Sequence, residues 1–270
     1  MHGMLRLILL LALGCLAPVS VARATPAADI VSVSFLPGWQ DTNGRRMAAI
    51  RFELAAGWKT YWRSPGDAGI PPIFNWSGSQ NLAGVRIHWP RPHVFAVNGL
   101  QSIGYKHELV LPIELTPVDP TQPIGLRAEI DMGVCSDICV PAAVGFSARV
   151  ESGGQSDPMI QAALADRPAT PDEAGLAGIG CTVEPIEDGL RVTATLALPP
   201  TGGAETVVFE PHSGPVWVSE ALVQRAAGVL TASAELVAET GKPFALDRGA
   251  MVVTVLGSDR AVEIIGCPAP

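Results

Sequence analysis

The stretch Gly133-Val134-Cys135-Ser136-Asp137-Ile138-Cys139-Val140-Pro141 predicts a tight β-hairpin that carries two cysteines. An extended strand rises about 3.3 Å per residue, so a straight chain would place the Cα atoms of Cys135 and Cys139 roughly 13 Å apart. A disulfide needs these atoms within about 7 Å of each other. Ser136 and Asp137 favour a turn, because short polar side chains can bond neighbouring backbone groups. A three-residue loop would therefore bring the two cysteines opposite each other.

On both sides of this hairpin the sequence has many short apolar or alternating segments separated by Gly, Pro and Asn, which is typical of an all-β sandwich. Before residue 156 the expected strands are Val31–Phe35, Met47–Leu54, Gly57–Tyr61, Ile73–Trp76, Val85–Trp89, Leu109–Thr116, Leu126–Met132 and Ala143–Val150. After residue 180 they are Leu190–Leu198, Thr206–Glu210, Val216–Val218, Val229–Leu236, Met251–Leu256 and Val262–Ile265.

A short helix and a linker are predicted between these two groups of strands. Asp157 can cap a helix whose first position is Pro158, and Arg167-Pro168 would end it. Residues 169–180 are rich in Ala, Gly, Pro and acidic residues and suggest a connecting segment. We therefore expect two β-sandwich domains, at residues 25–155 and 179–270, joined by a helix and linker at 156–178.

The first 24 residues have the features of an export signal. Arg6 supplies a positive charge, Leu5–Leu16 is an apolar run, and Val21-Ala22-Arg23-Ala24 offers a small-x-small cleavage site. Pro18 and Arg23 cut the run short of the roughly 20 apolar residues that span a bilayer. We expect a mature chain that begins at Thr25, has no membrane span and is periplasmic. The net charge of −8 argues against nucleic acid as a partner.

Four cysteines remain once the signal is removed, in a compartment where disulfides persist: Cys135, Cys139, Cys181 and Cys267. Spacing favours pairing the near two and the distant two. A Cys181–Cys267 bond would tie the first strand of the second domain to its last. Closing a loop of that length stabilises a fold by about 4.5 kcal/mol in the chain-entropy model.

The near pair has three interpretations. A bond that closes so small a loop constrains the unfolded chain little, and small, strained or exposed disulfides are the redox-labile ones, which favours thiol–disulfide exchange. A second possibility is a purely structural bridge. The third is Cu(I), which prefers thiolate ligands and could recruit His88, His93 or His107. A base near the cysteines is not visible in the sequence, although Lys106, His107 or Arg127 could approach in space.

Three motifs resemble the periplasmic N-terminal domain of the DsbD/ScsB group of protein-disulfide reductases. They are the segment from Trp58 to Pro72, with W-K-T-Y-W-R-S-P-G-D-A-G-I-P-P, the pair Gly104-Tyr105 before L-V-L-P at 109–112, and the cysteine hairpin. The resemblance covers roughly residues 30–150, and the two-domain layout is similar to the ScsB side of the group.

The resemblance implies an immunoglobulin-like sandwich that acts as a protein thiol:disulfide oxidoreductase without a cofactor, with Cys135 and Cys139 as the catalytic pair. Its expected partners are thioredoxin-fold periplasmic proteins and a separately encoded membrane electron transporter. A cap loop is implied at about residues 95–104. Candidates for the cap or for the wall of the site are Phe95, Asn98, Tyr105, Asp137 and Pro141. The alternative is a Cu(I)-binding module for copper tolerance or delivery that uses the same cysteines.

Overall fold

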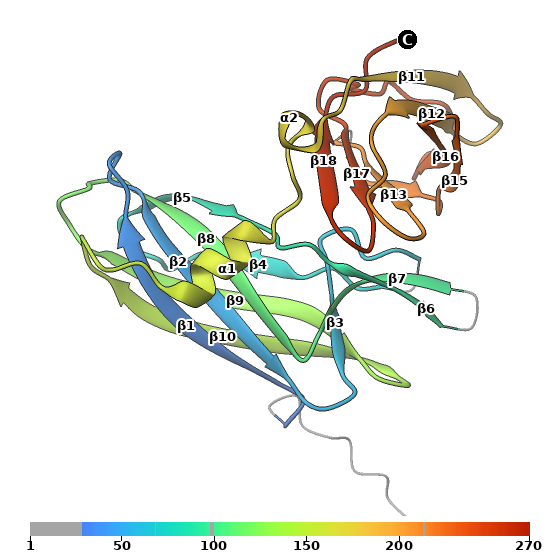
Figure 1. The fold of residues 1–270 in the computed structure, drawn as a ribbon. Coiled ribbons are helices and arrows are strands. Elements are labelled where there is room, and N and C mark those ends of the chain that lie inside the picture. Colours follow the sequence, from blue (N-terminus) through green and yellow to red (C-terminus); the bar gives the residue numbers. More distant parts are fainter. Residues whose placement is uncertain (1–28, 68, 98–99, 213) are drawn as a thin grey trace, which may run out of the picture.

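The computed structural model describes residues 29–67, 69–97, 100–212 and 214–270, and it consists mainly of β-strands (Figure 1). The predicted signal at residues 1–24 lies outside the described residues. The strands form four sheets, two built from residues 31–150 and two from residues 178–265. We call these groups the N-terminal sandwich and the C-terminal sandwich. The prediction of an all-β fold of immunoglobulin-like type is confirmed.

The N-terminal sandwich contains a sheet with the order β1-β2-β8-β5 and a second with the order β10-β9-β3-β7-β6, in which β4 also pairs with β9. The strands of this sandwich are β1 (Val31–Gln40), β2 (Arg46–Leu54), β3 (Lys59–Tyr61), β4 (Ile73–Asn75), β5 (Leu82–Ile87), β6 (His93–Val97), β7 (Leu100–Lys106), β8 (Glu108–Pro117), β9 (Ile124–Cys135) and β10 (Cys139–Val150).

Strand β9 shows why these segments form a sandwich. From Ile124 to Val134 every second side chain is apolar and buried, while the intervening positions up to Asp131 are more exposed. Successive side chains of a strand point to opposite faces of its sheet, so this alternation turns one face inward. The buried face meets apolar residues of β2 and β8, and together they form one core. The opposite face of the β9 sheet carries the two cysteines.

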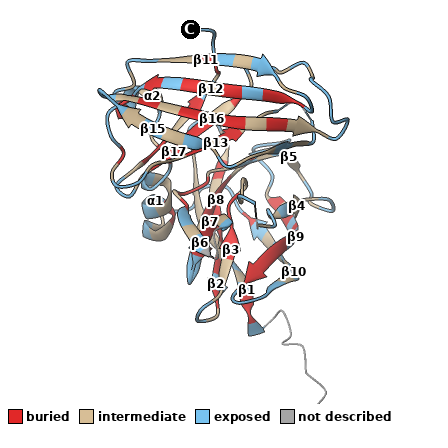
Figure 2. Ribbon diagram, turned by 90° about the vertical axis from the view of Figure 1, so that its right-hand side faces the viewer, coloured by how far each residue is buried: buried red, intermediate tan, exposed pale blue. Residues whose placement is uncertain are grey.

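The C-terminal sandwich pairs a sheet of order β11-β12-β16-β14, with β15 also paired to β16, with a three-stranded sheet of order β13-β17-β18. Strands β12 and β16 alternate between buried and more exposed positions, which Figure 2 shows as interrupted red bands. The strands are β11 (Gly178–Pro185), β12 (Leu190–Ala197), β13 (Thr206–Glu210), β14 (Val216–Val218), β15 (Leu222–Ala226), β16 (Val229–Ala238), β17 (Val252–Leu256) and β18 (Ala261–Ile265).

Two short helices connect the sandwiches. Helix α1 (Pro158–Ala165) begins as predicted, with the Asp157 carboxylate accepting hydrogen bonds from the backbone N–H groups of Met159 and Ile160. Helix α2 (Pro171–Ala174) lies in the segment expected to be a linker. Its signal is the capping box that Thr170 forms with Glu173, a pattern recognisable in the sequence.

Four strands were not expected from the sequence: β6, β7, β11 and β15. The first two pair as an antiparallel hairpin at the edge of the β9 sheet, in the segment where a cap loop was expected, residues 95–104. The shielding of the cysteines by this segment stays a prediction. Glycine and polar residues interrupt the apolar pattern there, so local periodicity gave no strand signal. Within the described residues, no helix is long and apolar enough to cross a membrane.

Candidate functional site

Cys135 and Cys139 face each other at the end of the β9–β10 hairpin and form a disulfide. Their Cα atoms are 4.1 Å apart, and the loop of residues 136–138 is closed by a hydrogen bond of 3.0 Å from the Ser136 N–H to the Ile138 carbonyl. Cys135 is completely buried, whereas Cys139 is exposed. The two sulfurs therefore differ in their access to a partner molecule.

The hydroxyl of Tyr61 lies against both sulfurs. It donates a hydrogen bond of 2.7 Å to Sγ of Cys135 and lies 3.3 Å from Sγ of Cys139. Strand β3 holds Tyr61 there, because Lys59 and Thr60 pair with Cys135 and Val134 of β9, and Thr60 Oγ1 donates to the Gly133 carbonyl at 3.0 Å. Burial raises the pKa of Tyr61, so its hydroxyl stays a hydrogen-bond donor at neutral pH.

Three chain segments approach one another closely at Gly133, two residues before Cys135. An added Cβ at Gly133 would meet Cβ of Ile70 at 2.7 Å and the Tyr61 ring at 3.2 Å. An added Cβ at Gly69 would meet the same ring at 2.8 Å. The absence of side chains at both glycines therefore leaves room for the Tyr61 ring between the hairpin and the loop that follows β3.

A pair of lysines lies on the same face of the sheet as the disulfide. Lys59 is the cross-strand partner of both Cys135 and Lys106. The ammonium groups of Lys59 and Lys106 lie 5.3 Å and 4.5 Å, respectively, from the centroid of the Phe95 ring. Lys59 Nζ also donates a hydrogen bond to Ser102 Oγ at 3.2 Å. Burial, and then the charge of Lys106, lowers the pKa of Lys59. This face therefore offers positive charge beside the cysteines.

The other predicted site residues are distributed as follows. Phe95 lies on the disulfide face, where the ammonium groups of Lys59 and Lys106 are close to its ring. Asp137 is exposed in the hairpin loop, and Pro141 is exposed on the disulfide face opposite Gly133. Asn98 lies outside the described residues. Arg127 pairs with Glu129 and is eight residues before Cys135 on β9, about 26 Å along the strand.

The placement of Tyr105 as a wall of the cysteine site is wrong. Tyr105 pairs with Thr60, and both side chains point to the core face of the sheet, away from Cys135. The Tyr105 ring stacks on Trp89, and its hydroxyl donates to the Pro90 carbonyl at 2.8 Å. Tyr61 lies on the adjacent strand β3, and its side chain points to the other face of the sheet, where it contacts both sulfurs.

The three histidines considered as copper ligands are separated. His88 lies near Glu114 on the β8 sheet, His93 packs beside Phe95, and His107 occupies the β7–β8 turn with a positive φ of 66°. Among the described residues, no three His, Cys, Asp or Glu side chains gather closely enough to hold a metal ion.

Cys181 and Cys267 form the second disulfide, which joins strand β11 to the segment that follows β18. Both are buried, and their Cα atoms are 5.5 Å apart. The guanidinium group of Arg248 donates hydrogen bonds to the carbonyls of both cysteines and reinforces the closure.

Residues 31–150, which contain the cysteine hairpin, Tyr61 and the lysine pair, match the family model described as thiol:disulfide interchange protein DsbD, N-terminal. The resemblance to DsbD N-terminal domains is confirmed. A comparison with curated protein sequences gave no match.

Among solved structures, the fold is similar to the N-terminal periplasmic domain of ScsB from Proteus mirabilis. That match has a TM-score of 0.69 at 22% sequence identity, and it covers 92% of this chain and 96% of the other. A second match is the N-terminal domain of Neisseria meningitidis DsbD in the reduced form. It has 18% identity and a TM-score of 0.28, and it covers 48% of this chain and 91% of the other. The likeness to the ScsB domain includes both sandwiches, so this chain shares the two-sandwich fold of that domain.

Proposed function

We propose that this protein exchanges electrons with thioredoxin-fold proteins of the periplasm through reversible opening of the Cys135–Cys139 disulfide. The observation that carries the proposal is the asymmetry of the pair. Cys139 is an exposed residue, and Cys135 is buried with a tyrosine hydroxyl 2.7 Å from its sulfur. Thiol–disulfide exchange needs one sulfur that can be reached and one that leaves as a stabilised thiolate.

In the proposed reduction, the thiolate of a partner protein attacks Sγ of Cys139. A bond forms between the two proteins while the Cys135–Cys139 bond breaks, and its electron pair remains on Cys135 as a thiolate. The Tyr61 hydroxyl already points at this sulfur and donates a charge-assisted hydrogen bond to it, which favours departure. The ammonium group of Lys59, on the neighbouring strand, adds an attractive charge.

The second half of the exchange releases the partner. Its remaining thiolate attacks its own sulfur in the mixed disulfide, and Cys139 leaves as a thiolate. The partner becomes a disulfide, and this chain holds the two electrons as a dithiol. The same steps in reverse pass the electrons to an oxidised thioredoxin-fold protein. The direction in the cell depends on the reduction potentials of the partners.

A trapping experiment tests this function. The Cys135→Ser variant keeps Cys139, whose sulfur is first converted to a mixed disulfide with thionitrobenzoate. It is then mixed with a reduced thioredoxin-fold protein whose second active-site cysteine is replaced by serine, so that the thiolate of the partner attacks Cys139 and thionitrobenzoate leaves with the electron pair. We expect a stable mixed disulfide through Cys139, identified by mass spectrometry. The matched Cys139→Ser variant keeps only the buried sulfur and should react at least about tenfold more slowly, because thiol exchange requires access to the attacked sulfur. Equal trapping of both variants would contradict the assignment of Cys139, and no trapping of either would reject the function.

The copper alternative uses the same sulfurs and is decided by a separate measurement. The reduced protein is loaded with Cu(I) and passed through gel filtration beside the Cys135→Ser variant. Retention of about one ion that depends on Cys135 would support a copper site, since Cu(I) prefers sulfur ligands. We expect no such retention if exchange is the function.

A further inference from the structure

The loop that follows β3 lies between the disulfide face and the C-terminal sandwich. We call residues 62–67 and 69–70 the interdomain loop. Its backbone is fixed to β7 by hydrogen bonds from the Trp62 N–H to the Ile103 carbonyl, 2.9 Å, and from the Ile103 N–H to the Pro65 carbonyl, 2.8 Å. Gly66 has a positive φ of 78°, and an added Cβ there would lie 2.8 Å from the Gln101 carbonyl oxygen. The loop therefore packs tightly on β7 and has little room to move toward it.

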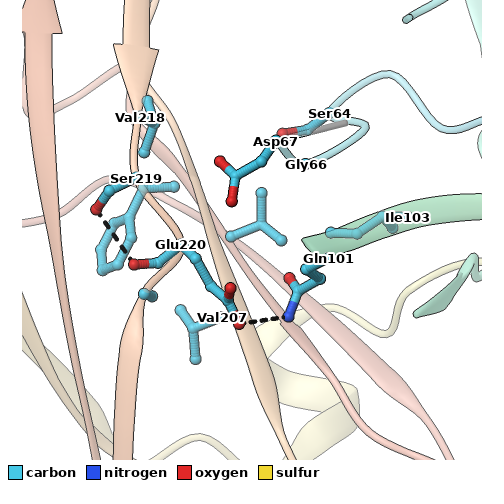
Figure 3. A pocket seen from close by; sticks show the side chains of 12 residues that line it. Ser64, Gly66, Asp67, Gln101, Ile103, Val207, Val218, Ser219 and Glu220 are labelled. Atoms are coloured by element: carbon cyan, nitrogen blue, oxygen red, sulfur yellow. Dashed lines mark hydrogen bonds between the residues drawn. The ribbon is translucent and has the colours of Figure 1, made fainter. Parts of the chain in front are cut away.

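The other side of the loop faces the C-terminal sandwich across a small cavity of about 50 Å³ (Figure 3). Ser64, Gly66 and Asp67 line this cavity from one side, and Val207 and Val218 line it from the other. At its edge, Gln101 Nε2 of β7 donates to Glu220 Oε1 at 2.8 Å, as the dashed line in Figure 3 marks. The loop is thus in contact with both sandwiches.

Arg63 links this loop to the C-terminal sandwich through two carboxylates. Its guanidinium group donates to both carboxylate oxygens of Glu210, at 2.8 and 2.9 Å, and also to Glu263. Its Cζ atom lies 4.4 Å from the centroid of the fully buried Trp62 ring. Bidentate arginine–carboxylate pairs are geometrically specific, so this arrangement fixes the loop in orientation as well as in distance.

The linked loop also supports Tyr61. Tyr61 precedes Trp62 and Arg63 in the chain, and the Gly69 backbone and Ile70 pack beside its ring and Gly133. A displacement of the loop would therefore free space around the ring whose hydroxyl contacts both sulfurs. The route from the C-terminal sandwich to the disulfide runs through Glu210 and Glu263, Arg63, the loop and Tyr61.

We infer that Arg63 is a positioning residue for the redox pair, through which the C-terminal sandwich holds Tyr61 in hydrogen-bonding contact with the sulfurs. This inference rests on the proposed exchange function and assigns the C-terminal sandwich a part in it. The hydrogen bond from Tyr61 stabilises the Cys135 thiolate. Loosening the loop should therefore raise the pKa of that thiol and shift the equilibrium with glutathione toward the disulfide.

The test compares Arg63→Gln and Glu263→Gln with a matched control, Arg225→Gln. Arg225 makes a bidentate ion pair with Glu205, at 2.6 and 2.7 Å, inside the C-terminal sandwich and away from the interdomain loop. For Arg63→Gln we expect the equilibrium constant for reduction of the Cys135–Cys139 disulfide by glutathione to be roughly three- to tenfold smaller. A tenfold change corresponds to about 30 mV in reduction potential. The pH profile of thiol alkylation should move to higher pH. The Arg225→Gln variant should match the wild type in both measurements.

A double-mutant cycle separates positioning from general damage. In Tyr61→Phe the hydroxyl is absent, so Arg63→Gln should add no further change in the equilibrium constant in that background. Additive effects, or an Arg63→Gln variant identical to the control, would overturn the inference.

If Arg63→Gln fails to fold, the same comparison is made with Glu263→Gln and with the conservative Arg63→Lys. If the wild type itself does not exchange with glutathione or with a thioredoxin-fold protein, the proposed function fails first, so the two failures are distinguishable.

Discussion

At the scale of single residues, the chemistry of the cysteine pair depends on which tyrosine reaches it. The chain has two tyrosines, Tyr61 and Tyr105, on adjacent strands and in opposite phases of the strand alternation. Tyr61 contacts both sulfurs, and Tyr105 is held in the core by Trp89 and the Pro90 carbonyl. Two variants that each remove one hydroxyl therefore separate a redox role from a structural one.

Replacing Tyr61 with phenylalanine should slow the reaction of the reduced pair with an alkylating agent near neutral pH by roughly three- to thirtyfold. The physical reason is the loss of a hydrogen bond to a charged sulfur, which contributes about 1.5–3 kcal/mol in proteins and is partly replaced by water. The measurement is the alkylation rate as a function of pH. A profile that superimposes on that of the wild type would contradict the role given to Tyr61.

Replacing Tyr105 with phenylalanine should change stability and its pH dependence but not alkylation. Burial raises the pKa of Tyr105 well above its ordinary value. The unfolded chain loses this proton near pH 10, whereas the folded chain keeps it, so the free energy of unfolding falls as the pH rises above about 10. Urea unfolding between pH 8 and pH 11 should show a smaller decline in the free energy of unfolding for Tyr105→Phe than for the wild type. At neutral pH the variant should be about 1 kcal/mol less stable, because the bond to the Pro90 carbonyl is lost. An unchanged slope above pH 10 would show that Tyr105 ionises freely in the folded protein.

At the scale of elements, the arrangement of β3, β9 and the interdomain loop depends on the absence of a side chain at Gly133. Hairpin β9–β10 could be predicted from the sequence, because its turn residues and its alternation are local signals. Strands β6 and β7 could not, since their own apolar pattern is broken and β7 joins the sheet by pairing with β3, which is distant in sequence. The helix cap at Thr170 was a local signal that the sequence did contain.

Gly133→Ala should destabilise the protein by about 1–3 kcal/mol, the usual effect of adding a methyl group to a packed site. The new Cβ would lie 2.7 Å from Cβ of Ile70 and 3.2 Å from the Tyr61 ring, so both must move. The matched control is Gly84→Ala, where an added Cβ meets nothing within 4 Å. Chemical unfolding of the two variants gives the comparison. The Gly133→Ala variant should also show the slower alkylation expected of Tyr61→Phe. A Gly133→Ala variant as stable as the Gly84→Ala control would contradict the close packing of Gly133 against Ile70 and Tyr61.

At the scale of the whole molecule, we expect the two disulfides to differ in role, with Cys135–Cys139 reactive and Cys181–Cys267 stabilising the fold. Cys139 is exposed and closes a short loop, whereas Cys181 and Cys267 are buried and lie 86 residues apart in the sequence. The long loop constrains the unfolded chain far more strongly than the short one in the chain-entropy model. The C-terminal sandwich, closed by this disulfide, carries Glu210 and Glu263, the two carboxylates that bind Arg63.

Mild reduction followed by mass spectrometry should therefore open Cys135–Cys139 while Cys181–Cys267 stays intact. Replacing both Cys181 and Cys267 with alanine should lower the free energy of unfolding by about 4.5 kcal/mol, against about 2 kcal/mol for the equivalent change at the near pair. Thermal or urea unfolding of the two double variants measures this difference. Equal resistance of the two disulfides to reduction would contradict the division of roles.

The sequence by itself determined the all-β class, most strand positions, the turn between Cys135 and Cys139, and the resemblance to DsbD N-terminal domains. These features depend on local alternation, turn chemistry and short motifs, which a linear chain displays directly. Only the tertiary structure decided that Tyr61 rather than Tyr105 meets the sulfurs, that Cys139 is the exposed member of the pair, and that Arg63 bridges to Glu210. The place of Tyr61 depends on the register between strands distant in sequence, because a shift of one residue moves a side chain to the opposite face of the sheet. The exposure of Cys139 and the Arg63–Glu210 bridge depend on which distant segments pack beside the hairpin and the loop.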